Sequence, residues 1–155
     1  MDMPQPTALH ERLHTLAGRW SGEEQLHPSP WDPKGGTAEG HVDNHSGLDG
    51  FALIQDYVQV RDGATTYRGH AVFSVDTGAN EVVLHWFDNM GSPPNVFRGN
   101  YAGDTLVLSF AGPQGQQRVS FRQDTPGHYD FRMEVSGDGA NWQTFMTGSY
   151  QRQPG

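Results

Sequence analysis

Cysteine is absent from these 155 residues, which excludes disulfides, thiolate nucleophiles and Cys-ligated zinc or iron–sulfur sites. Positive charge is scarce, because 10 Lys and Arg stand against 18 Asp and Glu, a formal net charge of −8. That sign disfavours nucleic acid and anionic membranes as partners. No apolar run reaches the ~20 residues of a membrane-spanning helix, and residues 1–18 lack the basic and apolar regions of a secretory signal. We therefore expect a cytoplasmic protein.

Apolar residues make up only 34% of the chain, whereas glycine (20 residues) and proline (10 residues) are plentiful. This balance favours many strands joined by tight turns over a helical bundle. The length fits one domain over residues 1–155, large enough to bury a core.

One short helix is expected over about residues 7–17, because Leu9, Leu13 and Leu16 share a helical face. Thr7 can cap its start, with Glu11 in the first turn, and Gly18 ends it. Alternating segments then follow, separated by turn residues, at about 19–27, 37–46, 50–61, 65–75, 81–88, 95–101, 105–111, 116–123, 128–135 and 141–151. No helical pattern separates these segments, so parallel strand connections are not expected.

The predicted fold is all-β, a single closed antiparallel β-barrel of eight to ten strands over about residues 19–151. Closing the sheet removes its edges and leaves an interior that side chains fill or that holds one small ligand. The helix is expected to cover one end of the barrel or a gap between strands.

Several segments in this order resemble the bacterial family known as domain of unknown function 1579. The likeness runs from about Leu13 to Tyr150 and is carried by Leu16–Gly22 (LAGRWSG), Gly47–Gly50 (GLDG), Val75-Asp76, Trp86-Phe87-Asp88 and Gly148-Ser149-Tyr150. The resemblance implies a calycin-like or lipocalin-like barrel around a pocket, and it implies no reaction.

The opening Gly18-Arg19-Trp20-Ser21-Gly22 is also similar to that of nitrobindin-like haem barrels. In those barrels a histidine near the C-terminal strands binds the iron. The segment 141–151 has no histidine here, so we expect no haem and no other cofactor.

His41, Asp43 and His45 alternate on one face of a predicted strand, in a pattern similar to a metal site. The two histidines are four residues apart, which is ~13 Å along a strand. Zn–N bonds are about 2.1 Å long, so both cannot bind one ion without a bulge. A solvated strand face and no metal site are expected.

Other polar residues also have a structural interpretation. Asp76 and Asp88 precede glycine within three residues and predict hairpin turns. Leu84, Trp86 and Asp88 share a face by alternation, which turns His85 to the other face.

We predict that the barrel binds a small, largely apolar molecule and is not an enzyme. Its ligand-binding residues are expected to be the inward aromatic and methionine side chains, with two basic residues for orientation: Trp20, Phe73, Trp86, Phe97, Tyr129, Phe131, Met133, Trp142, Met146, Arg68 and His70. Arg68 and His70 share one face of a strand and Phe73 lies on the other, so the two placements exclude each other unless a bulge occurs at Gly69. Phe73 inward is preferred.

The sequence leaves two alternatives open. One is an enzyme that uses a cavity histidine (His70, His85 or His128), with a metal or haem. The other is a filled barrel that acts through surface association. The expected partner is a small apolar or weakly acidic molecule, with no nucleic acid and no membrane, and homodimerisation is left open.

Overall fold

The alternating segments form ten strands in the computed structural model, which describes residues 2–30, 32–91, 93–113 and 115–154. Helix α1 (Ala8–Leu13) and the 3-10 turn η1 (His14–Leu16) precede the strands, and a second 3-10 turn, η2 (Leu48–Gly50), joins β2 to β3. The strands are β1 (Gly18–Leu26), β2 (Gly36–Gly47), β3 (Ala52–Arg61), β4 (Ala64–Asp76), β5 (Glu81–Asp88), β6 (Asn95–Ala102), β7 (Thr105–Gly112), β8 (Gly115–Thr125), β9 (His128–Ser136) and β10 (Gln143–Arg152).

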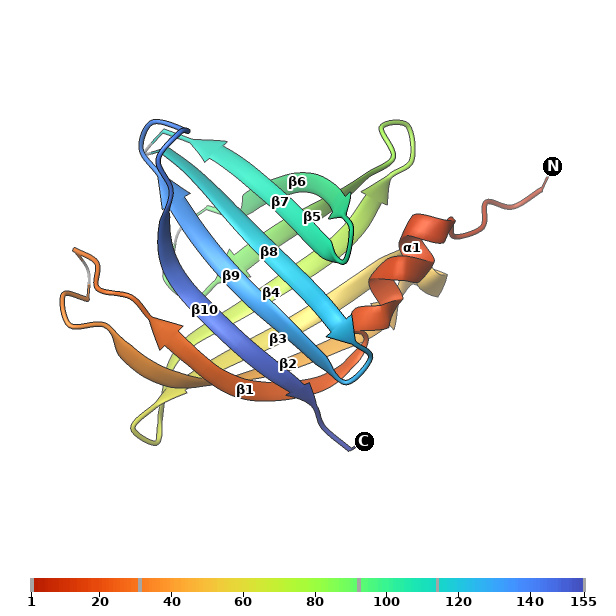
Figure 1. Cartoon of the computed structure of the whole chain (residues 1–155). Coiled ribbons are helices and arrows are strands. Elements are labelled where there is room, and N and C mark those ends of the chain that lie inside the picture. The colour runs from red at the N-terminus through yellow and green to blue at the C-terminus, as the bar shows by residue number, and fades with distance from the viewer. Residues whose placement is uncertain (1, 31, 92, 114, 155) are drawn as a thin grey trace.

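The ten strands close into one antiparallel barrel, as predicted. Each strand pairs with its neighbour in sequence, and β1 pairs with β10, with Trp20 opposite Arg152 and Leu26 opposite Met146. Figure 1 shows the strands crossing the barrel obliquely, with α1 at one end. Closure pairs the strands at what would otherwise be two open edges.

Helix α1 lies where the sequence predicts a helix, but its capping partner differs. The backbone N–H of Thr7 donates to Nδ1 of His10 at 2.9 Å, so His10 rather than Glu11 completes the cap. This follows from the geometry of a first helical turn, in which the third residue after the cap reaches back to it. His10 is 3% exposed and its ring lies edge-on against Phe51, 5.3 Å between centroids.

The helix closes one end of the barrel. Leu13 and Leu16 are buried and join the core that includes Trp20, whose indole N–H donates to the Leu16 carbonyl at 3.0 Å. The Asn44 side chain donates to the same carbonyl at 2.9 Å. The apolar side chains of the helical segment are thus buried, and the Leu16 carbonyl accepts hydrogen bonds from side chains of the first two strands.

The other end of the barrel is formed by the connections after the odd-numbered strands. Antiparallel strands alternate in direction, so the connections after β1, β3 and β5 all lie opposite α1. The turn after β3 has a positive φ at both Asp62 and Gly63, a conformation suited to a two-residue hairpin. We call this end the mouth.

Candidate functional site

A cavity of about 820 Å³ lies inside the barrel and extends to the mouth. Side chains from the connection after β1 (His27, Ser29 and Asp32) and from that after β5 (Met90 and Pro93) border it. The inner faces of the strands supply the rest of its wall. The core at the helix end is filled, so the barrel is closed at one end and hollow at the other.

Most of the cavity wall is apolar. Phe121 is central to it, with ring centroids 5.2 Å from Phe131 and 6.4 Å from Tyr129. The apolar and aromatic wall is formed by Leu26, Val42, Leu84, Phe97, Val119, Phe121, Tyr129, Phe131, Met133, Phe145 and Met146. A wall of this composition suits a ligand with an apolar body.

One part of the wall is backed by a buried carboxylate. Glu24 on β1 is 0% exposed. It accepts hydrogen bonds from the Tyr57 hydroxyl at 2.6 Å, from Gln59 Nε2 at 3.0 Å and from the Tyr150 hydroxyl. Gln59 Nε2 also donates to the Tyr57 oxygen at 3.2 Å. Three donors therefore satisfy the carboxylate from the cavity side.

Two glycines give this cluster its space. A Cβ atom on Gly40 would lie 2.3 Å from Glu24 Oε2 and 2.8 Å from the Tyr150 ring, and one on Gly148 would lie 2.6 Å from Tyr150 Cζ. Burial, with the negative charge of Glu24 as a smaller cause, raises the pKa of Tyr57 and of Tyr150 well above its ordinary value. Both hydroxyls therefore stay protonated and act as donors to Glu24.

Three aromatic rings border the mouth half of the cavity beside Asp88. The ring centroids of Tyr57, Tyr67 and Trp86 are 6.1 to 6.3 Å apart in every pair. Tyr67 donates to Asp88 Oδ2 at 2.7 Å and accepts from the Trp86 indole N–H at 3.2 Å. A Cβ on Gly69 would lie 2.2 Å from the Trp86 indole, so this glycine lets the indole lie flat against β4. We call Tyr57, Tyr67 and Trp86 the aromatic trio.

Arg61 borders the mouth and is already paired. Its guanidinium lies 2.9 Å from Asp32 Oδ2 and donates to the Gly35 carbonyl at 3.1 Å. Among the lining residues that the structure describes, Arg61 is the one Lys or Arg. The ion pair ties the end of β3 to the connection after β1.

Most of the predicted binding residues face the cavity. The structure places six of the predicted aromatic and methionine side chains in the wall: Trp86, Phe97, Tyr129, Phe131, Met133 and Met146. Trp20 and Phe73 point inward but are 1% exposed and lie in the filled core at the helix end. Trp142 was expected inside and lies instead outside the wall, with the Arg118 guanidinium 4.1 Å from its ring centroid. It precedes β10, so the strand alternation does not turn it inward.

The structure corrects the interior placement expected for Arg68 and His70. Both are exposed on the outer face of β4, where His70 Nδ1 lies 2.8 Å from Asp56 Oδ1. The pairing of β3 with β4 runs without a shift through Tyr57↔Gly69 and Val58↔Arg68. Without a bulge at Gly69, strict alternation puts Phe73 inside and Arg68 outside.

The other histidines considered for chemistry also lie off the cavity wall. His85 alternates with the lining residues Leu84 and Trp86, as predicted. His128 Nδ1 lies 2.8 Å from Asp124 and its Nε2 lies 2.8 Å from Ser149 Oγ. The cavity wall thus contains none of the three histidines of the enzyme alternative.

His41, Asp43 and His45 lie on the outer face of β2, where all three are exposed. His41 pairs with Glu39 at 3.2 Å, and His45 lies 3.9 Å from Asp43. Within the described ranges, no group of three or more His, Asp and Glu side chains is positioned to hold a metal ion.

The sequence interpretation did not assign the polar groups described above to the cavity: Tyr57, Gln59, Arg61, Tyr67 and Asp88 in its wall, and Glu24 behind it. Alternation carries a signal for some of them. Glu24 shares a face with Trp20, and Tyr67 shares one with Phe73. A polar residue that shares a strand face with an inward aromatic residue is therefore a candidate for the cavity wall.

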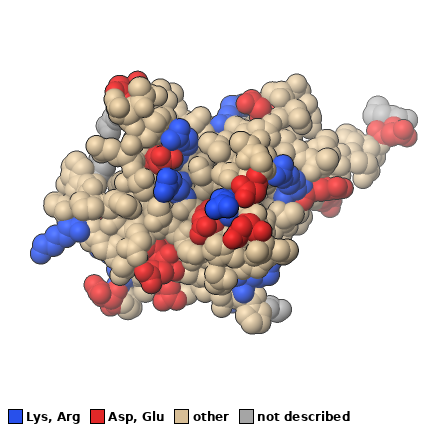
Figure 2. Space-filling view, in the orientation of Figure 1, with Lys and Arg blue, Asp and Glu red and all other residues tan. Residues whose placement is uncertain are grey.

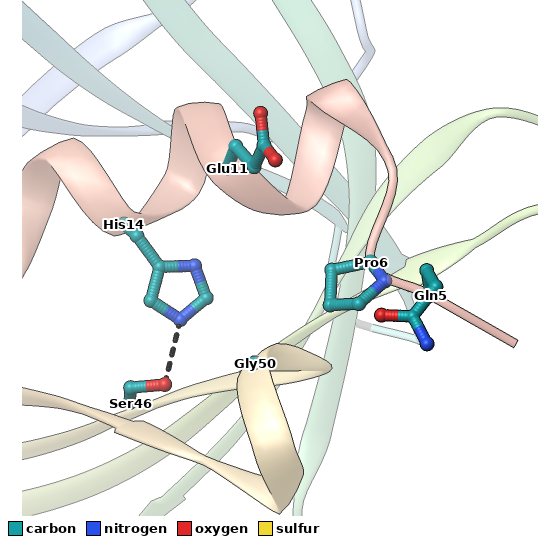
Figure 3. A pocket seen from close by; sticks show the side chains of 6 residues that line it. All are labelled: Gln5, Pro6, Glu11, His14, Ser46 and Gly50. Atoms are coloured by element: carbon teal, nitrogen blue, oxygen red, sulfur yellow. Dashed lines mark hydrogen bonds between the residues drawn. The ribbon is translucent and has the colours of Figure 1, made fainter.

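A second, more open hollow of about 410 Å³ lies outside the barrel between α1 and the connection from β2 to β3. Figure 3 shows His14 of η1 pointing to Ser46, with Nε2 and Oγ 3.0 Å apart. Its Nδ1 lies 2.6 Å from the His10 carbonyl oxygen. Nε2 thus joins the helical segment to β2, whereas Nδ1 is bonded within the helical segment.

Charged side chains of both signs are interspersed on the face seen in Figure 2. Cross-strand ion pairs of the barrel include Arg118–Glu134 and Arg122–Asp104, each at 3.1 Å. In the described part of the chain, no helix combines the length and apolar character needed to cross a membrane.

Comparisons with known proteins agree with this architecture. The family model described as "Protein of unknown function (DUF1579)" matches residues 5–152. No curated protein matches the chain.

Solved structures match over nearly the whole chain. The crystal structure of Rv2717c from M. tuberculosis has a TM-score of 0.72 at 16% identity, covering 97% of this chain and 100% of that one. The S-type phycobiliprotein lyase CPES from Guillardia theta has a TM-score of 0.65 at 9% identity, covering 96% and 94%. At these identities the likeness shows a shared calycin-like barrel fold and no more.

Proposed function

We propose that this chain, which belongs to the DUF1579 family, binds a small and largely apolar molecule inside its barrel. The observation that carries the proposal is the cavity of about 820 Å³ with its apolar and aromatic wall. Ligand sites are typically concave spaces of about 300–1,000 Å³, mostly apolar, with a few polar groups that orient the ligand. This cavity has that size and that composition.

The alternatives have less support. A filled barrel would bring its inner side chains together, whereas here Phe131 and Met133 border open space. An enzyme built on His70, His85 or His128 would need one of them to reach the cavity, and none lies in its wall. A binding role needs only the wall that is present.

The proposal is tested by filling the cavity. Val119 and Met133 are partners across β8 and β9 and both line it, so the double variant Val119→Trp/Met133→Trp adds two indoles to the space. The matched control is Ser120→Trp/Arg132→Trp, the next pair in register, whose side chains alternate to the outer face. Circular dichroism establishes that each variant folds.

Titration calorimetry with decan-1-ol, a neutral apolar probe, measures the binding. We expect saturable 1:1 binding to the unmodified protein and to the control. The filled variant should bind at least about tenfold more weakly, a loss of roughly 1.4 kcal/mol. Absence of decan-1-ol binding to the unmodified protein, or equal binding to the filled variant, would refute the proposal.

A further inference from the structure

We propose that the cavity selects a ligand whose apolar body carries one positively charged nitrogen, held beside Asp88 and the aromatic trio. This inference rests on the proposed function and adds the charge of the ligand to it. It also replaces the expectation of a weakly acidic ligand, which depended on Arg68 inside the barrel. Arg68 lies on the outer face.

The ionised groups around the cavity are unbalanced toward negative charge. Arg61 and Asp32 neutralise each other at 2.9 Å. Asp88 lines the cavity and accepts hydrogen bonds from Tyr67 and from the Met90 backbone at 2.9 Å, and no cation pairs with it in the described ranges. Glu24, behind Tyr57, is likewise bonded only to neutral donors. Two carboxylates thus flank the aromatic trio without a cation.

The hydrogen-bonding capacity left on the aromatic trio and Asp88 is for accepting. The Tyr57 hydroxyl proton is directed to Glu24, and that of Tyr67 is directed to Asp88. The Trp86 N–H is in turn directed to the Tyr67 oxygen. A carboxylate has about four acceptor positions, and Asp88 uses two of them here. A ligand group placed beside Asp88 must therefore donate.

The aromatic trio favours the same charge. All three rings border the cavity, and their centroids lie within 6.3 Å of one another. A cation within about 6 Å of a ring centroid is attracted to the ring face, and tryptophan is the strongest such partner. The Asp88 carboxylate and the ring faces of the aromatic trio both attract a cation, and the trio has no unbonded donor to offer an anion. These features favour a ligand with an ammonium group over one with a carboxylate group.

The test compares three probes with the same ten-carbon chain: decylamine, decan-1-ol and decanoate, each titrated calorimetrically near neutral pH into the full chain. We expect decylamine to bind at least about tenfold more tightly than decan-1-ol, the gain of a charge-assisted hydrogen bond. Decanoate should bind more weakly than the alcohol, because it meets two carboxylates, and the one Lys or Arg among the described lining residues, Arg61, is already paired with Asp32.

The variant Asp88→Asn keeps an acceptor for Tyr67 and removes the charge. It should bring the decylamine affinity of the variant to within about threefold of the decan-1-ol affinity of the same variant. The matched control is Asp56→Asn, which removes the same charge on the outer face, where Asp56 contacts His70. That control should retain the preference for decylamine. It therefore separates the effect of the charge on Asp88 from the general attraction of a cation to a protein with a net charge of −8.

Decan-1-ol binding without an amine preference, or the same loss of that preference in both variants, would overturn this inference and leave the proposed function intact. Absence of decan-1-ol binding would refute the proposed function and, with it, this inference. Tighter binding of decanoate than of decylamine would also overturn this inference, because the cavity would then prefer an anionic ligand.

Discussion

Gly40 shows how one missing side chain makes a buried carboxylate possible. Gly40 lies on the inner face of β2, and a Cβ atom on it would lie only 2.3 Å from Glu24 Oε2. The same space admits the Tyr150 ring, whose hydroxyl donates to Glu24. Glycine at this position thus supports the hydrogen bonds that keep Glu24 satisfied away from water.

A test at this scale is Gly40→Ala. The added methyl must displace Glu24 or Tyr150, and overpacking of this kind costs about 1–3 kcal/mol of unfolding free energy. Urea denaturation followed by circular dichroism measures the change. Gly127→Ala is the control, because a Cβ there meets nothing within 4 Å. Equal stability of the two variants would contradict the proposed crowding at Gly40.

At the scale of the element, α1 and η1 act as the closure of the barrel. Their buried leucines, Leu13 and Leu16, extend the core at this end of the barrel. Arg12 points outward, and its guanidinium carbon lies 3.7 Å from the ring centroid of Tyr101 on β6. Six helical residues in α1 are too few to be stable alone. Packing against the barrel therefore holds this helix.

Leu16→Ala tests that packing. Leu16 is 3% exposed, and truncating such a leucine costs about 2–5 kcal/mol through lost burial and the void left behind. Leu9→Ala is the comparison, because Leu9 is only partly buried against the same core. We expect the urea midpoint to fall much further for Leu16→Ala. A similar small shift for both would mean that the helix contributes little to the fold.

For the whole molecule, the folded state favours the protonated form of all five tyrosines. Burial raises the pKa of Tyr57, Tyr67, Tyr101, Tyr129 and Tyr150 above the ordinary value. Glu24 raises the pKa of Tyr57, Tyr129 and Tyr150 further. The hollow barrel therefore depends on neutral phenols.

The consequence is a steep loss of stability at alkaline pH. A tyrosine in the unfolded chain loses its proton at about pH 10, whereas in the folded state it retains the proton. Below that pH, the stability that comes from the raised tyrosine pKa values is fully present. Above it the unfolded chain binds fewer protons, so the unfolding free energy falls by about 1.4 kcal/mol per pH unit for each tyrosine.

Ultraviolet absorbance of tyrosinate and circular dichroism, followed together on raising the pH, measure this. Tyrosinate should appear with unfolding and not before it. In Glu24→Gln, which removes the neighbouring charge, ionisation should begin at lower pH. Full tyrosinate absorbance in a protein that remains folded would contradict the prediction.

The sequence by itself determined the barrel and the inward face of part of its apolar wall. Period-two alternation between turn residues is local, so it predicts strands such as 81–88 and the inward side of Phe131 and Met133 directly. It also predicts Phe73 inside, because the more apolar face of a strand is buried.

Only the tertiary structure decided how deep the cavity reaches and which polar groups meet in it. Trp20 and Phe73 face inward like Trp86 but lie at the end that α1 fills. Glu24 meets Tyr150 across 126 residues of sequence. Alternation gives the face of a side chain and not its height along the barrel. Strand register, barrel closure and the helix set that height, and they depend on contacts between distant parts of the chain.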